Sequence, residues 1–211
     1  MADVDWGLIA VFAIAVFFLA WYYGAFLYSR RLAGRIATEL KDAVLALGGT
    51  SQIRWFGTTA FRMTTEGANA PLRDVSVTVT LRPREMPINW AIGTAQGRRD
   101  AALVEASLRV NPRIGFELVD PRTRLGRRRA RAKGGWSTVT LGGREWLLSA
   151  EDEHEASRLV EALGSPPFEP IMALHVTAGS KPGIAASVSV EKGHAARGLA
   201  AIQALAERLA I

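Results

Sequence analysis

The longest unbroken apolar stretch lies near the start of the chain, at residues 6–28, with no charged residue between Asp5 and Arg30. A helix of this length can cross a hydrocarbon core of roughly 30 Å, and a single span in lipid must be helical to satisfy its backbone. A buried core helix is the alternative, but apolar runs of this length rarely occur in one. We therefore predict a transmembrane helix. Amphipathic rings that favour the membrane interface stand at its two ends: Trp6 at the first, and Trp21, Tyr22, Tyr23 and Tyr28 toward the second.

Charges flanking this stretch predict its orientation. Asp3 and Asp5 precede it, whereas Arg30 and Arg31 follow it, with further basic residues up to Lys41. The positive-inside rule then leaves residues 1–5 outside the cytoplasm and the remainder inside. The stretch lacks a basic region before it and a small-residue cleavage site after it, so we expect an uncleaved anchor. The expected location is the cell membrane, with a single span.

A helical period continues after the apolar stretch, at residues 29–48. Apolar side chains recur there every three or four positions, and Gly48 and Gly49 favour a left-handed end to the helix. We expect a juxtamembrane amphipathic helix, and the sequence leaves open whether it continues directly from the span. Its predicted buried positions are Leu32, Ile36, Leu40, Val44 and Leu47.

From residue 53 onward the pattern changes to a period of two, which is typical of half-buried strands. The clearest strand is 73–82, where Val75, Val77, Val79 and Leu81 share one face. Residues 101–110 fit a strand better than a short helix, and 136–148 fit a hairpin about Gly142 and Gly143. The remaining predicted strands are 53–56, 61–64, 114–119, 172–176 and 184–190.

Two further helices are expected in the second half of the chain. One begins near Asp152, which has capping-box spacing from Ser149, and ends at Gly164. The last helix follows His194 and buries Leu199, Ile202, Leu205 and Leu209. Residues 88–99 are too rich in glycine for a clear assignment. These elements predict an α+β fold in which one N-terminal transmembrane helix precedes a β-rich cytoplasmic domain at 49–211, with helices packed on the sheet.

The net charge of +6 comes from one short segment, residues 121–135, which contains seven basic residues and no acidic one. The rest of the chain has 19 basic and 20 acidic residues. We expect a mobile basic loop that binds RNA or anionic lipid headgroups, with a purely solvated loop as the alternative. Without an interleaved aromatic residue, contact with phosphate is favoured over base readout. The candidate binding residues are Arg122, Arg124, Arg127, Arg128, Arg129, Arg131 and Lys133.

Signs of catalysis are weak in this sequence. The chain has no cysteine, and His154 lies near Glu151 and Glu155 in what reads as an acidic first helical turn rather than a metal site. His175 and His194 fit surface and helix-boundary positions. The glycine spacing in residues 93–99 does not match a phosphate-binding loop. We therefore predict no enzyme, no catalytic or metal-binding residue, no cofactor and no small-molecule substrate.

The order of these parts resembles the calumin family, single-span subunits of the PAT intramembrane chaperone. The resemblance covers about residues 20–178 and includes the Arg30–Arg31 pair, FRMTTEG at 61–67 and VSVTVTLRPRE at 75–85. It implies a cytosolic α+β domain beside the translocon and the ribosome. The family's acidic lumenal segment and basic coiled-coil tail have no counterpart here.

Two functions follow as expectations. The first is a membrane-anchored adaptor that assists membrane-protein insertion, with the basic segment on ribosomal RNA phosphate and the apolar helix available to another membrane protein. The second is a structural protein whose basic segment binds anionic lipid headgroups.

Overall fold

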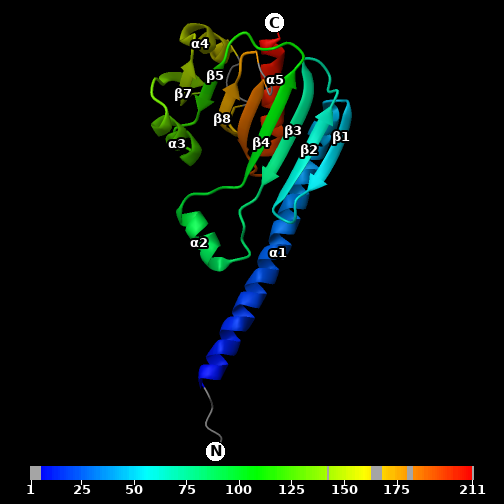
Figure 1. Cartoon of the computed structure of the whole chain (residues 1–211), viewed down its shortest axis with the longest axis vertical. Helices are drawn as coiled ribbons and strands as arrows, with labels where there is room; N and C mark the ends of the chain where they lie inside the picture. The colour runs from blue at the N-terminus through cyan, green and yellow to red at the C-terminus, as the bar shows by residue number, and fades with distance from the viewer. Residues whose placement is uncertain (1–5, 142, 163–167, 180–182, 211) are drawn as a thin grey trace, which may run out of the picture.

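The structure is a computed structural model that describes residues 6–210, except 142, 163–167 and 180–182. Its first element, α1 (Trp6–Ala46), is one helix of 41 residues. The N-terminal half of α1 extends away from the rest of the molecule, and the C-terminal half packs against a sheet (Figure 1). The described chain is therefore a folded α+β body with a long apolar helix projecting from it.

α1 runs without a break through the predicted transmembrane stretch and the predicted juxtamembrane helix, a continuity that the sequence left open. Its first half is solvent-exposed and uncharged, and among the described residues it is the helix long and apolar enough to cross a membrane. Burial begins at Ser29 and follows the predicted stripe through Leu32, Ile36 and Leu40 to Val44. Gly48 and Gly49 then take positive φ values of 74° and 72°, which confirms the expected helix end.

All neighbouring strands are antiparallel in a nine-stranded sheet of order β1-β2-β3-β4-β9-β8-β5-β7-β6. The predicted strands are confirmed, with shifts of a few residues at their ends. The strands are β1 (Thr50–Trp55), β2 (Ala60–Glu66), β3 (Leu72–Thr80), β4 (Ala101–Leu108), β5 (Phe116–Val119), β6 (Ser137–Leu141), β7 (Arg144–Ala150), β8 (Ile171–Val176) and β9 (Ile184–Ser189).

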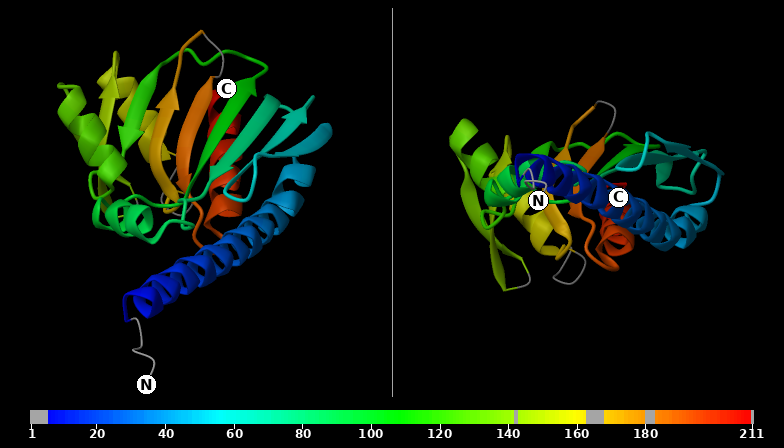
Figure 2. Two further views of the ribbon diagram at one scale, coloured as in Figure 1. Left: turned by 60° about the horizontal axis from the view of Figure 1, so that its bottom comes forward. Right: turned by 90° about the horizontal axis from the view of Figure 1, so that it is seen from below.

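One face of the sheet is apolar and is covered by helices. Val75, Val77 and Val79 of β3 point to this face, as predicted, and each is almost fully buried. α1 and α5 (His194–Leu209) contact each other and the sheet there, behind the strands in Figure 1 and below the sheet in the right view of Figure 2. α5 approaches β9 so closely that a Cβ on Gly198 would lie 2.4 Å from a methyl of Val188.

α4 (Glu153–Ala162) contacts β6 and β7 at the other end of the sheet. The backbone N–H of Glu155 donates to Asp152 Oδ1 at 2.9 Å, so Asp152 is the capping residue. The expected role of Ser149 is wrong, because it lies in β7. The predicted helix end at Gly164 and the predicted hairpin residue Gly142 lie outside the described residues.

The two remaining helices differ from expectation. Residues 88–99, which had no clear assignment, are partly helical: α2 (Pro87–Ala95) begins one residue earlier, with proline at its start. The basic segment 121–135 is not simply a loop, because it contains α3 (Arg124–Ala132). α3 contacts β5 and β8. Its ion pair to Glu117 lies on the face opposite the apolar one, because Glu117 alternates with buried Phe116 and Leu118.

Candidate functional site: an arginine-lined cleft

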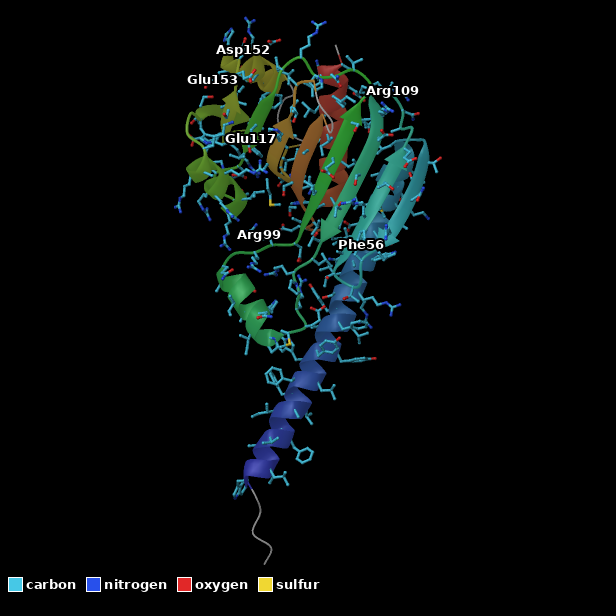
Figure 3. All side chains as sticks on the ribbon, viewed as in Figure 1. Phe56, Arg99, Arg109, Glu117, Asp152 and Glu153 are labelled. Carbon is cyan, nitrogen blue, oxygen red and sulfur yellow. The ribbon has the colours of Figure 1, made fainter. Side chains whose placement is uncertain are left out.

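A cleft of about 1340 Å³ opens between α3, the link from α2 to β4, and the adjoining ends of β8 and β9. Figure 3 places Arg99 on that link, between α2 and α3 in the view. Three carboxylates line the cleft, at Asp120, Glu169 and Glu191. Eight arginines line it as well: Arg98, Arg99, Arg122, Arg124, Arg127, Arg128, Arg131 and Arg144.

The start of α3 is determined by residues 120–126. Thr123 Oγ1 donates to the carbonyl of Asp120 at 2.8 Å and accepts from the backbone N–H of Gly126 at 2.9 Å, which caps the helix. Gly126 is needed at this position because a Cβ there would lie 2.0 Å from the same carbonyl oxygen. This capping allows a helix to begin within a run of mutually repelling cations.

Asp120 stabilises the same turn by pairing with Arg122. Its carboxylate accepts from Arg122 Nε at 2.9 Å, from Nη2 at 2.7 Å and from the Arg122 backbone N–H at 2.9 Å. Burial alone would raise the pKa of Asp120, but these hydrogen bonds, with the charges of Arg122 and Arg144, hold the pKa below its ordinary value. The same pair raises the pKa of Arg122. Asp120 is therefore ionised at neutral pH, and one cleft arginine is neutralised.

A second carboxylate attaches α3 to the sheet. Glu117 of β5 pairs with Arg129 and lies 4.0 Å from Lys133 Nζ, and its side chain is largely buried. Figure 3 shows Glu117 beside α3. Arg129 and Lys133 do not line the cleft. These two basic residues therefore support the position of α3.

Most of the other cleft arginines carry uncompensated charge among the described residues. Arg144 lies 3.8 Å from Glu169, and Arg127 donates only to the carbonyl oxygen of Arg122, at 2.8 Å. Within the described part of the chain, six cleft arginines have no carboxylate within 4 Å: Arg98, Arg99, Arg124, Arg127, Arg128 and Arg131. Each guanidinium can make two parallel hydrogen bonds to a phosphate group. The cleft therefore has the charge and the hydrogen-bond donors to accept an anion that carries more than one phosphate group.

Metal-binding and acid–base groups are dispersed by comparison. His154 lies in α4, His175 is exposed on β8, and His194 begins α5 at the rim of the cleft. Over residues 6–210, less the gaps given above, no three His, Cys, Asp or Glu residues come together in a way that could hold a metal ion.

The structure brings five of the seven predicted basic residues to the cleft: Arg122, Arg124, Arg127, Arg128 and Arg131. Sequence reasoning missed Arg98, Arg99 and Arg144, which come from two distant parts of the chain. The Arg98–Arg99 pair was visible after the glycines of residues 93–97. The sequence does not indicate that this pair lies near α3, because that proximity depends on the order of strands in the sheet.

The aromatic residues predicted for the membrane interface lie along α1. Trp6, Tyr22, Tyr23 and Tyr28 are exposed, as are Arg30 and Arg31. Trp21 differs, because its ring packs against Trp90 of α2 with centroids 5.6 Å apart. Its indole N–H also donates to the carbonyl of Arg84 at 2.9 Å. α2 is thus attached to α1 at the end of the apolar half.

No protein-family model matches this chain, and no curated protein matches it.

Proposed function

We propose that this protein is anchored in the cell membrane by the first half of α1 and that its arginine-lined cleft binds the phosphate groups of anionic lipids in the same membrane. The observation that carries the proposal is the set of six cleft arginines without a carboxylate partner among the described residues. The function is binding, without catalysis.

The anchor is supported by the composition and exposure of α1. From Trp6 to Ala20 every side chain is exposed, and none is charged. Such a surface is unfavourable in water and suits a lipid environment. Basic residues follow this half at Arg30, Arg31 and Arg35, which supports a cytoplasmic position for the sheet.

Lipid headgroups are supported as the ligand by the position of the cleft. Arg98 and Arg99 follow α2, which contacts Trp21 near the end of the apolar half of α1. If that half spans the bilayer, these arginines lie close to the headgroup layer. Each basic side chain near an anionic surface contributes on the order of 1 kcal/mol to membrane association.

An adaptor at the translocon and ribosome is the second proposal. It is supported by the exposed arginines along α3, which suit a nucleic-acid backbone because no aromatic residue lies between them for base stacking. The resemblance in layout to the calumin family favours the same role. In this case α1 could also pack on another membrane protein.

The experiment uses the full chain in nanodiscs that contain equal amounts of phosphatidylcholine and phosphatidylglycerol. Native mass spectrometry then measures how many lipids of each kind remain bound. The cleft variant combines Arg124→Ala, Arg128→Ala and Arg131→Ala. The control combines Arg113→Ala, Arg158→Ala and Arg208→Ala, which removes the same charge from exposed positions outside the cleft.

We expect the wild type and the control to retain phosphatidylglycerol selectively and the cleft variant to lose this selectivity. Equal retention by both variants would overturn the lipid proposal. Salt-sensitive co-sedimentation with ribosomes, measured on the same proteins, tests the second proposal. Ribosome binding that is lost only in the cleft variant, with lipid retention unchanged, would favour the adaptor.

A further inference from the structure

We propose that α2 is a second membrane-contact element that lies in the interface of the bilayer crossed by α1. The inference rests on the proposed function only in assuming that α1 spans a membrane. It adds a contact that the anchor does not require.

The apolar surface of α2 is unusual for a helix facing water. Its sequence, PINWAIGTA, contains no charged residue. Ile88 is 62% exposed and Ile92 is 50% exposed, and their spacing of four residues places them on one side of the helix. Met86, just before the helix, is 53% exposed. Together they form the α2 apolar face, defined by Met86, Ile88 and Ile92.

The position of α2 identifies the partner as lipid. Trp90 packs on Trp21 of α1, and Phe17 lies one turn further along α1 with its ring 6.0 Å from that of Trp21. α2 therefore lies beside the exposed apolar surface of α1, with Ile88 and Ile92 on the side of α2 away from Trp90. A bilayer that surrounds the exposed half of α1 also reaches α2. Figure 1 shows α2 below the sheet, on the side toward the projecting half of α1.

α2 is held in this position by polar contacts on both sides. Before it, the Arg84 guanidinium lies over the ring of Tyr28 at 5.3 Å and donates to Asp100 at 2.5 Å. Within it, Thr94 accepts from the Arg82 side chain at 3.2 Å. These contacts tie α2 to α1 and to the start of β4, so its apolar face stays turned outward.

The charges next to α2 complement a phospholipid surface. Arg98 and Arg99 follow its C-terminal end and are exposed. A helix without charge, followed at once by two exposed arginines, suits the boundary between acyl chains and phosphate groups. The same arginines line the cleft, so an embedded α2 would place the cleft entrance at the headgroup layer.

The absence of native cysteine allows a direct test on the full chain, because each introduced cysteine carries the only label. Phe12→Cys, Ile92→Cys and Val110→Cys are spin-labelled in nanodiscs. Their relaxation is then measured with oxygen, which concentrates in lipid, and with a water-soluble nickel chelate. Phe12 reports on the anchor. Val110, 59% exposed beside Arg109, is the aqueous control, at the end of the sheet far from the α1 N-terminus (Figure 3).

We expect the ratio of oxygen to nickel accessibility at position 92 to be several-fold higher than at position 110 and to approach the ratio at position 12. A lipid-like ratio at 12 with an aqueous ratio at 92 would overturn the α2 proposal and leave the anchor intact. An aqueous ratio at 12 would overturn both. If Ile92→Cys misfolds, Ile88→Cys gives the same reading from the same side of α2.

Discussion

The guanidinium of Arg84 lies 2.5 Å from the carboxylate of Asp100, and both side chains are largely buried. Asp100 also accepts the backbone N–H of Arg82 at 2.7 Å. This ion pair joins the two ends of the segment between β3 and β4, which includes α2, and holds that segment against α1. Removing the carboxylate therefore leaves a buried cation without its partner.

Asp100→Asn should lower the free energy of unfolding by about 2–3 kcal/mol, because a charged hydrogen bond is lost and Arg84 stays buried. Thermal unfolding of the full chain in nonionic detergent measures the change. The control is Asp74→Asn, which removes the exposed ion pair with Arg73 and should cost under about 1 kcal/mol. Equal losses in the two variants would contradict the structural role of the Asp100 pair.

Neighbouring arginines in α3 should behave differently when replaced. Arg129→Ala removes the partner of Glu117 and should cost about 1–2 kcal/mol of stability while leaving lipid retention nearly unchanged. Arg128→Ala removes a cleft cation that has no carboxylate partner among the described residues. It should reduce phosphatidylglycerol retention, with stability changed by no more than about 0.5 kcal/mol. Unfolding and native mass spectrometry on both variants check this separation. The reverse pattern would show that the two roles are assigned to the wrong residues.

Gly126→Ala should displace the start of α3. The added Cβ would lie 2.0 Å from a backbone oxygen that cannot rotate away, so we expect a loss of about 1–3 kcal/mol and weaker lipid retention. Gly34→Ala is the control, since that glycine also lies within a helix but a Cβ there would point into open space. The control should be neutral or more stable by up to about 1 kcal/mol. A neutral Gly126→Ala would contradict the close approach.

Acid should weaken the turn that begins α3. Because the pKa of Asp120 is lower in the folded chain than in the unfolded chain, its stabilisation is fully present above about pH 4 and is lost as the pH falls through the lowered pKa. The difference in free energy of unfolding between wild type and Asp120→Asn should therefore be constant near neutral pH and shrink below about pH 4. Unfolding measured across this range tests the sign. A difference that grows on acidification would contradict it.

The fold could be predicted largely from periodicity because most of its helices and strands have one solvent-exposed side and one buried side. The alternation at Val75, Val77 and Val79 predicted β3, and the stripe through Leu32 and Leu40 predicted the buried half of α1. The pairing of β4 with β9 could not be predicted, since four other strands lie between them along the chain. A local sequence pattern does not indicate which distant strand will lie beside a given strand.

The cleft could be predicted only in part for the same reason. A run of cations in isolation favours a mobile loop, so α3 was missed. Its stability depends on Asp120 and Glu117, which lie before the run, and on the cap supplied by Thr123. The Thr123–Gly126 spacing was a readable signal for that cap. The contributions of Arg99 and Arg144 depended on how the sheet is ordered.

The unbroken course of α1 would couple the orientation of the sheet to the thickness of a membrane crossed by its first half. Its first half would lie in the bilayer while its second half is packed into the core, and the helix runs between them without interruption. A helix longer than the local hydrocarbon layer tilts to keep its apolar length covered. Since the body must turn with the helix, a thinner membrane would bring a different edge of the domain toward the lipid surface.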